Sequence, residues 1–405
     1  MFFNGKGRKF SLTLMSFLLV TLLLAACGEA TNTAAPAAST APASATTAAA
    51  GATTAAAASA GASTSAAATP SNSYKVSANV TLSGSGASFP DKAYQKWIAN
   101  FATANPSVKL SYKSVGSGTG RKAFFAGEVD FAGSDAYPSR TETENYGKPI
   151  VTIPTTISGV TLAYNLPGVT GLRLSPEILG GLYTGRIARW NDAAIKAENP
   201  SATLPDTAIT FAVRSDSSGT SDIFSNYLAA VSPEFKALGI AGSQPEWGKG
   251  GIQITKGEQN PGVATAIKQN VGMIGYVDFG DAVAQNLVFA DLKNAAGQYV
   301  KPSPESFSQA EPAGGVPDNL QLKVANSANP KAYPITSTTW IILPKDMKDK
   351  DKAEALITFL WWVTHDQQQI GAVKELGFAA LPASVLPKIE STLKSITANG
   401  QPVLK

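Results

Sequence analysis

The sequence predicts an α/β fold with two lobes over residues 76–405 of a chain of 405. Strand-like and helix-like segments alternate along this part, which is typical of sheets covered by helices. Its length of roughly 330 residues exceeds what one hydrophobic core usually supports. Polar, glycine-rich turns follow several of the predicted strands, where α/β sheets bind their ligands. We therefore expect two lobes and a ligand site at the strand ends.

Hydrophobic spacing predicts the individual elements. Residues 91–104 carry four apolar side chains at helical spacing, after a proline that favours the first helical position. Further helices are predicted over Arg121–Ala126, Ser221–Ala230 and Lys352–Gln369. Strands are predicted over Val76–Ser83, Val108–Tyr112, Val129–Ala132, Val160–Tyr164, Ile209–Val213 and Ile274–Val277.

Residues 1–27 have the pattern of a secretory signal. Three basic residues precede an apolar run that is shorter than the ~20 residues a membrane-spanning helix needs. The run ends in Leu24-Ala25-Ala26-Cys27, which resembles the bacterial lipobox, whose cysteine is lipidated. The alternative is an ordinary signal peptide that is removed together with Cys27. The lipobox is favoured because Cys27 is the only cysteine, so it has no partner for a disulfide.

Residues 28–75 form a low-complexity segment that we predict to be a disordered linker. It consists almost wholly of Ala, Thr, Ser, Gly and Pro, with very little charge. Such a segment cannot bury enough apolar surface to offset its ordering entropy. As a flexible chain it would reach roughly 40 Å.

The overall charge gives no support for nucleic-acid binding. Three of the 33 basic residues lie in the predicted signal, which leaves 30 basic against 29 acidic residues in the rest of the chain. Any preference for anions must therefore come from a local site.

Four polar turns are the candidates for such a site. Three of them place hydroxyls and glycines before predicted helices, where unpaired N–H groups and the helix dipole favour anions. In one of these three, Arg214–Ser221, the side chain of Arg214 adds a charged fork suited to an oxyanion. The turns are Gly84–Pro90, Gly116–Gly120, Asp130–Asp135 and Arg214–Ser221.

Each turn taken alone has an ordinary structural interpretation. Ser88 stands in an N-cap position and could simply cap a helix. The same holds for Ser117 and Ser218. Arg214 and Asp216 could form a surface ion pair. The combination of the four turns favours an anion site.

Asp135 predicts which anion the site selects. A carboxylate repels an anion unless that anion can donate a proton to it. Phosphate near neutral pH always retains at least one proton, whereas sulfate retains none. An ionised Asp135 among hydrogen-bond donors would therefore accept from phosphate and reject sulfate. The alternative is a turn or capping residue.

The chain resembles the phosphate-binding receptors of the bacterial high-affinity phosphate ABC importer, from Val80 to about Leu386. The resemblance rests on the four turns and on four further stretches. These are Ile153–Pro167, Leu182–Trp190 (LYTGRIARW), Ile274–Asp278 (IGYVD) and Tyr333–Thr339 (YPITSTT).

The resemblance implies an anion held without water, metal or cofactor. It implies that Asp135 accepts the proton of the anion and that Asp216 orients the guanidinium of Arg214. The remaining implied contacts are the Ser88 hydroxyl, the Phe89 amide, Ser117, Arg214, Ser218, the Gly219 amide, and the amide and hydroxyl of Thr220.

The resemblance also implies a type II periplasmic-binding-protein fold with two hinge crossings, near Thr155–Ser158 and Tyr333–Ser337. Lobe I would comprise residues 76–156 and 333–405, and lobe II residues 157–332. Closure of the lobes would bury the anion between them.

The function expected from these features is a lipid-anchored extracytoplasmic receptor that delivers inorganic phosphate to the permease and ATPase subunits of an importer. A second possibility is a receptor for another oxyanion, such as sulfate, molybdate or a phosphonate, and a third is a sensor or adhesion module. A secreted phosphatase is disfavoured because it needs a metal cluster or an activated nucleophile, and His365 is the only histidine. We therefore expect a binding protein and not an enzyme.

Overall fold

The computed structural model describes residues 75–404. The predicted signal, Cys27 and all of the predicted linker except Lys75 lie outside the described residues. Within the described part of the chain, no helix is long and apolar enough to cross a membrane.

A mixed sheet of nine strands forms the centre of the protein, in the order β2-β1-β3-β12-β4-β8-β6-β7, with β9 also paired to β4. Strands β1, β2 and β3 are parallel to one another, and so are β6, β7 and β8. The strands are β1 Val80–Gly86, β2 Val108–Ser114, β3 Phe131–Ser134, β4 Ile150–Tyr164, β6 Thr210–Arg214, β7 Ile254–Gly257, β8 Met273–Asp278, β9 Val288–Phe289 and β12 Thr336–Pro344.

Two small sheets complete the strands. One has the order β11-β10-β5 and the other β13-β14-β15. Their strands are β5 Arg173–Leu174, β10 Asp291–Lys293, β11 Tyr299–Val300, β13 Asp346–Met347, β14 Thr397–Ala398 and β15 Gln401–Pro402.

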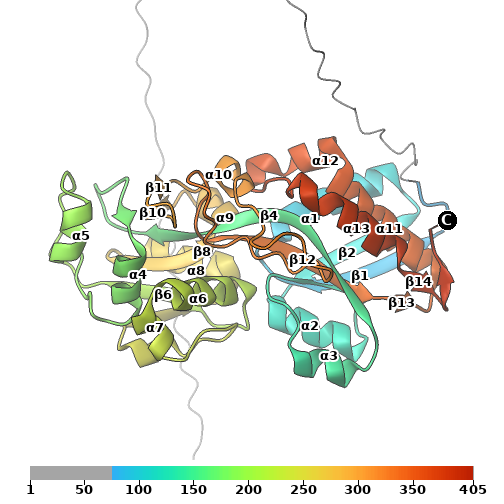
Figure 1. Cartoon of the computed structure of the whole chain (residues 1–405), viewed down its shortest axis with the longest axis horizontal. Coiled ribbons are helices and arrows are strands. Elements are labelled where there is room, and N and C mark those ends of the chain that lie inside the picture. The colour runs from blue at the N-terminus through green and yellow to red at the C-terminus, as the bar shows by residue number, and fades with distance from the viewer. Residues whose placement is uncertain (1–74, 405) are drawn as a thin grey trace, which may run out of the picture. The chain divides into compact units, whose positions relative to one another are not determined.

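The long strand β4 divides the nine-stranded sheet into two halves. Its residues 150–159 pair with β12, and residues 160–164 pair with β8. The first half therefore contains β1, β2, β3, β12 and the start of β4, and the second half contains the end of β4 with β6 to β9. Figure 1 shows β4 and β12 crossing between the two groups of helices. Ser158 and Ser337, one from each predicted crossing, are paired here; the lobe boundaries themselves stay a prediction.

Helices cover both faces of the first half. On one face, Trp97 and Phe101 of α1 are buried in the main core, and Phe101 meets Phe359 of α11 edge to face at 5.3 Å. On the other face, Phe124 of α2 packs with Ala132 of β3 and Ile342 of β12. The helices are α1 Asp91–Ala104, α2 Ser117–Ala126, α3 Arg140–Tyr146, α11 Lys350–His365, α12 Gln367–Ala372 and α13 Leu386–Lys394.

The second half is covered in the same way. Val263 and Ile267 of α8 pack with Ala212 of β6 on one face. On the other, Tyr183 of α4 packs against Phe211 and Phe224, with ring centroids 5.0 and 4.8 Å away. The helices are α4 Pro176–Tyr183, α5 Ala193–Glu198, α6 Gly219–Val231, α7 Pro233–Ala237, α8 Gln259–Gln269, α9 Phe279–Ala284 and α10 Pro304–Ser308.

The helix predicted over residues 91–104 is confirmed with the same bounds. Several other predictions need correction. Strand β4 begins at Ile150 and not at Val160, and helix α2 begins at Ser117 and not at Arg121. The first strand begins at Val80 and not at Val76. The helix predicted over Lys352–Gln369 is two helices, because the Asp366 side chain accepts hydrogen bonds from the backbone of Gln368 and Gln369 and starts α12 there.

Candidate anion-binding site

The four predicted turns lie at the carboxyl ends of β1, β2, β3 and β6, and the third, Asp130–Asp135, includes the whole of β3. The first three belong to the first half of the sheet and the fourth to the second half. Hydrogen bonds join the second turn to the fourth across the junction between the halves. We call five residues from these turns the anion cluster: Ser88, Ser117, Asp135, Arg214 and Thr220.

Ser88 lies between β1 and α1 and is 6% exposed. It is not the N-cap that the sequence suggested, because Pro90 occupies that position and no side chain caps the helix. The Ser88 hydroxyl oxygen instead accepts from the backbone N–H of Asn260 at 3.3 Å and from the Asn260 amide nitrogen at 3.1 Å. Its neighbour Phe89 is buried against Phe378, with ring centroids 6.4 Å apart.

Ser117 is the first residue of α2, after Gly116 in the cap position. Its hydroxyl oxygen accepts from the backbone N–H groups of Asp135 at 3.3 Å and Gly219 at 3.2 Å. Gly219 comes from the fourth turn, so this hydroxyl links the two halves. The simple capping interpretation therefore does not account for Ser117.

Asp135 directly follows β3 and is 3% exposed. One carboxyl oxygen accepts a hydrogen bond from the Thr339 hydroxyl at 2.7 Å, and the other lies 3.4 Å from the Ser117 hydroxyl. Burial raises the pKa of this carboxyl from 3.8 to about 7, against the opposing effects of the Thr339 hydrogen bond and the Arg214 charge. The group can therefore exchange a proton near neutral pH.

Arg214 ends β6, and its side chain is 1% exposed. Its guanidinium donates to both carboxyl oxygens of Asp216, at 2.8 and 2.5 Å, in a bidentate pair. Arg214 is buried and Asp216 is partly buried, so this is not a surface ion pair. The Arg214 charge and hydrogen bonds hold the pKa of Asp216 below its usual value, against the effect of its partial burial. Asp216 therefore stays ionised and fixes the plane of the guanidinium.

The fourth turn leads directly into α6, whose first residues are Gly219 and Thr220. The Thr220 hydroxyl oxygen accepts from Arg214 at 3.2 Å. Ser218 is the N-cap, and its side chain accepts from the backbone N–H of Ser221 at 3.1 Å. The capping interpretation is thus correct for Ser218, whose O–H proton remains able to donate to a ligand.

Three residues of the site were missed from the sequence. Thr339 holds Asp135, and Asn260 holds Ser88 and also donates to Thr220 at 3.1 Å. The Tyr276 hydroxyl accepts from the backbone N–H of Arg214 at 3.0 Å. Asn260 follows β7, so the rule that ligands bind at strand ends could have found it.

Direct contacts also join the two halves outside the anion cluster. The backbone N–H of Gly118 donates to the Ser217 carbonyl at 3.0 Å. Lys92 of α1 forms an ion pair with Asp281 of α9. Burial, followed by the Asp281 charge, raises the pKa of the neighbouring Asp278 carboxyl.

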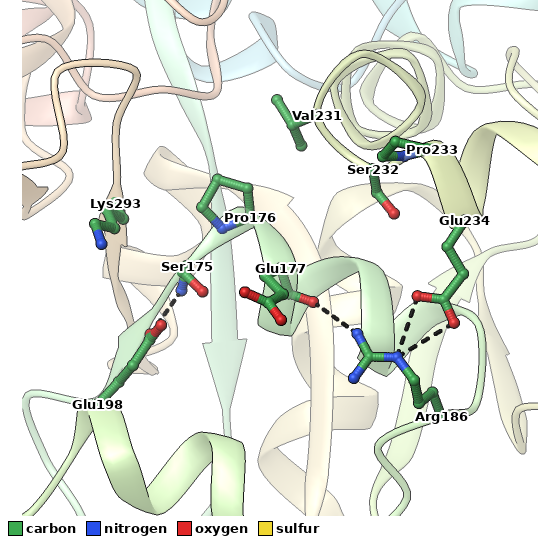
Figure 2. Close-up of a pocket in the computed structure, with 10 residues that line it drawn as sticks. All are labelled: Ser175, Pro176, Glu177, Arg186, Glu198, Val231, Ser232, Pro233, Glu234 and Lys293. Carbon is green, nitrogen blue, oxygen red and sulfur yellow. Dashed lines mark hydrogen bonds and ion pairs between the residues drawn. The ribbon is translucent and has the colours of Figure 1, made fainter.

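An open hollow of about 620 Å³ lies on the second half of the sheet, between α4 and the turn from α6 to α7 (Figure 2). Arg186 is one of the residues that line it, and its guanidinium donates to the Glu234 carboxylate and to the Glu177 carbonyl. None of the residues that line it belongs to the anion cluster.

The part of the chain from 75 to 404 contains no group of three or more His, Cys, Asp and Glu side chains placed to hold a metal. His365 is the last residue of α11, where its ring stacks on Trp361 at 4.8 Å. It is therefore engaged in packing at a helix end.

The fold, with donor-rich turns at the junction of its two α/β halves, is typical of a ligand-binding protein. Residues 36–367 match the family model of the PBP superfamily domain. The phosphate-binding protein PstS of Xylella fastidiosa is 36% identical over 327 residues, which cover 80% of this chain and 87% of that protein. PstS of Pasteurella multocida is 35% identical over 323 residues, covering 78% and 90%. The chain belongs to the PstS family of phosphate-binding proteins within the PBP superfamily.

Solved structures agree on the fold. The phosphate-binding protein of Stenotrophomonas maltophilia superposes with a TM-score of 0.59 at 22% identity, covering 78% of this chain and 93% of that one. The high-affinity periplasmic phosphate-binding protein PfluDING gives a TM-score of 0.58 at 23% identity, covering 77% and 92%. The periplasmic-binding-protein fold implied by the sequence resemblance is confirmed.

Proposed function

We propose that this protein captures one inorganic phosphate ion between the two halves of its sheet and delivers it to an ABC importer. The observation that supports this most is the buried carboxyl of Asp135 within a group of donors. Hydroxyls and one guanidinium suit an oxyanion, and a carboxylate among them suits only an oxyanion that still carries a proton. Phosphate meets that condition at neutral pH, and sulfate does not.

The proposed shell is the one expected from the sequence. It comprises the hydroxyls of Ser88, Ser117, Ser218 and Thr220, the guanidinium of Arg214 and the carboxyl of Asp135, with backbone amides of Phe89, Gly219 and Thr220. Two helices, α2 and α6, begin at this shell, and their N-terminal dipoles favour an anion.

The wider setting is proposed from the sequence. Lipid on Cys27 would anchor the receptor outside the cytoplasm, and the linker over residues 28–75 would let it reach its permease. ATP hydrolysis would come from the importer's ATPase subunits. The receptor itself would carry out no catalysis.

Titration calorimetry tests the proposal. The protein is unfolded in denaturant, dialysed free of bound anions, refolded in phosphate-free buffer and titrated with phosphate and with sulfate at pH 8. We expect one phosphate per chain and no heat from sulfate. Binding of sulfate or molybdate in preference to phosphate would assign another oxyanion. Steady release of phosphate from p-nitrophenyl phosphate would indicate a phosphatase.

A further inference from the structure

Asn260 connects hydroxyls from both halves of the site. It is the second residue of α8 and is fully buried, with 0% of its surface exposed. Its side-chain nitrogen donates to the Ser88 hydroxyl oxygen at 3.1 Å and to the Thr220 hydroxyl oxygen at 3.1 Å. Ser88 belongs to the first half of the sheet and Thr220 to the second. One amide group therefore joins two of the candidate anion ligands.

Each of these hydroxyl oxygens also accepts from a second group that can only donate. For Ser88 that group is the backbone N–H of Asn260, at 3.3 Å. For Thr220 it is the guanidinium of Arg214, at 3.2 Å. A hydroxyl has two lone pairs and one proton. With both lone pairs occupied, Ser88 and Thr220 each have only the O–H proton left to offer.

We propose that Asn260 is a positioning residue that makes the Ser88 and Thr220 hydroxyls donors toward the bound anion. This inference rests on the proposed function, because it concerns how the same phosphate site is organised. Without Asn260, each hydroxyl can rotate so that it accepts a hydrogen bond instead of donating one to the anion. Fixing the O–H group toward the anion on binding then costs part of the binding free energy. Asn260 removes that cost before the anion arrives.

The reverse orientation of the Asn260 amide does not fit its surroundings. The amide oxygen is buried and has no hydrogen-bond partner among the residues that the structure describes. Turning the amide over would move the NH₂ group to that position, where its two donors would be unpaired. It would also direct both hydroxyl protons at Asn260, which leaves none for an anion. An unpaired buried donor costs free energy comparable to a lost hydrogen bond.

The neighbouring residue Gln259 holds Asn260 in place from both halves. Its φ of 56° lies in the left-handed region, which is uncommon for a residue with a side chain. Its backbone N–H donates to Asp216 at 3.1 Å. Its side chain exchanges two hydrogen bonds with Ser114 at the end of β2, at 2.7 and 3.2 Å. This turn is therefore fixed by the same carboxylate that orients Arg214.

A double-mutant cycle on phosphate affinity tests the inference. Asn260→Leu keeps the approximate shape and removes the amide, and we expect phosphate binding about 10- to 100-fold weaker. If Asn260 acts through the hydroxyls, the factor by which Asn260→Leu weakens phosphate binding should be at least threefold smaller in a Ser88→Ala background. The same should hold in a Thr220→Val background. A merely structural role would weaken binding by the same factor in all three backgrounds. Circular dichroism and thermal melting check that each variant folds.

Asn294→Leu is the matched control, because Asn294 is a buried asparagine whose amide donates to the carbonyls of Pro330 and Ala332, at 3.0 and 3.1 Å, away from the anion cluster. It should lower thermal stability and leave phosphate affinity unchanged. If Asn260→Leu does not fold, Asn260→Ala replaces it in the cycle. Equal costs in all backgrounds would overturn the inference and leave the proposed function intact. Failure of the wild-type protein to bind phosphate would overturn both.

Discussion

Arg214 carries the full positive charge of the anion cluster, and its position is set by neighbours on three sides. Asp216 holds both edges of the guanidinium, Thr220 accepts from one nitrogen, and the Tyr276 hydroxyl holds the backbone. A guanidinium fixed in this way loses little side-chain entropy when an anion binds. Its contribution to binding is therefore expected to be large.

Arg214→Ala should weaken phosphate binding by roughly 1.5–3 kcal/mol or more, because a buried charge-assisted hydrogen bond is lost. Titration calorimetry measures the change. Arg189→Ala is the control, because Arg189 forms an exposed pair with Asp206 and should leave the affinity unchanged. Unchanged affinity in Arg214→Ala would place the anion site elsewhere.

Asp135→Asn should reduce discrimination more than affinity. The change keeps the shape, removes the charge and puts an NH₂ donor where sulfate needs one. Unmatched buried polar groups can discriminate on the order of 10⁴-fold, so sulfate should become a measurable competitor of labelled phosphate only in the variant. If the variant excludes sulfate as strongly as the wild type, Asp135 is only a turn residue.

The wild-type protein should show a related effect of pH. Burial raises the pKa of Asp135 to about 7, so the carboxyl gains a proton as the pH falls through 7. A protonated carboxyl can donate, which lifts the exclusion of sulfate. Sulfate should therefore compete better at pH 5 than at pH 8 in the wild type, and this difference should be smaller in Asp135→Asn, where only phosphate itself changes protonation. The same raised pKa makes the ligand-free fold less stable as the pH rises from about 4 to 7.

The sequence could predict the residues of the site that carry a recognisable pattern. Hydroxyls and glycines before helices and an arginine at a strand end are visible in the order of residues. Asn260 and Thr339 were missed for different reasons. Asn260 lies in the first turn of α8, and the residues before that helix lack the pattern. Thr339 lies inside a strand and reaches Asp135 only because β12 pairs with β3.

At the scale of elements, Gly219 at the start of α6 determines how closely the two halves approach. A Cβ at this position would lie 2.5 Å from the Ser117 hydroxyl oxygen and 2.6 Å from the Asp135 Cβ, closer than such atoms can approach. Only glycine therefore allows α6 to meet the first half at this distance.

Gly219→Ala should weaken phosphate binding strongly, because the halves could no longer close around the anion. Small-angle scattering in excess phosphate should show a larger radius of gyration than for the wild type. Gly371→Ala in α12 is the control, because a Cβ there has open space and should leave affinity unchanged. Wild-type affinity in Gly219→Ala would show that the halves bind the anion at a wider separation.

Prediction of the elements succeeded where one signal dominated. The 14 residues of α1 have regular apolar spacing and a preceding proline, and their bounds were predicted correctly. The end of α11 was missed because Asp366 is followed by three glutamines, which favour helix, while the break depends on capping by Asp366. The start of β1 was missed because apolar residues already alternate from Val76 as in a strand. In the structure Val76 is buried outside the strand, where its backbone N–H donates to the Asn105 side chain.

At the scale of the whole molecule, the anchor proposed at Cys27 determines where the receptor works. Cys27→Ala should move the protein from the membrane fraction to the soluble fraction, because lipid would be its only attachment. Fractionation and immunoblotting measure this, with a serine substitution in the linker, Ala55→Ser, as the control. A variant that still sediments with membranes would contradict lipid anchoring.

The direct contacts between the halves, such as Gly118 with Ser217 and Lys92 with Asp281, have a consequence for transport. They need no anion, so they stabilise this arrangement of the two halves with or without cargo. If phosphate binds to this arrangement, a larger population of it raises the apparent affinity for phosphate. It also lets receptors without cargo occupy the importer and delay loaded ones. Weakening one contact should therefore lower affinity yet speed uptake where receptors greatly outnumber importers.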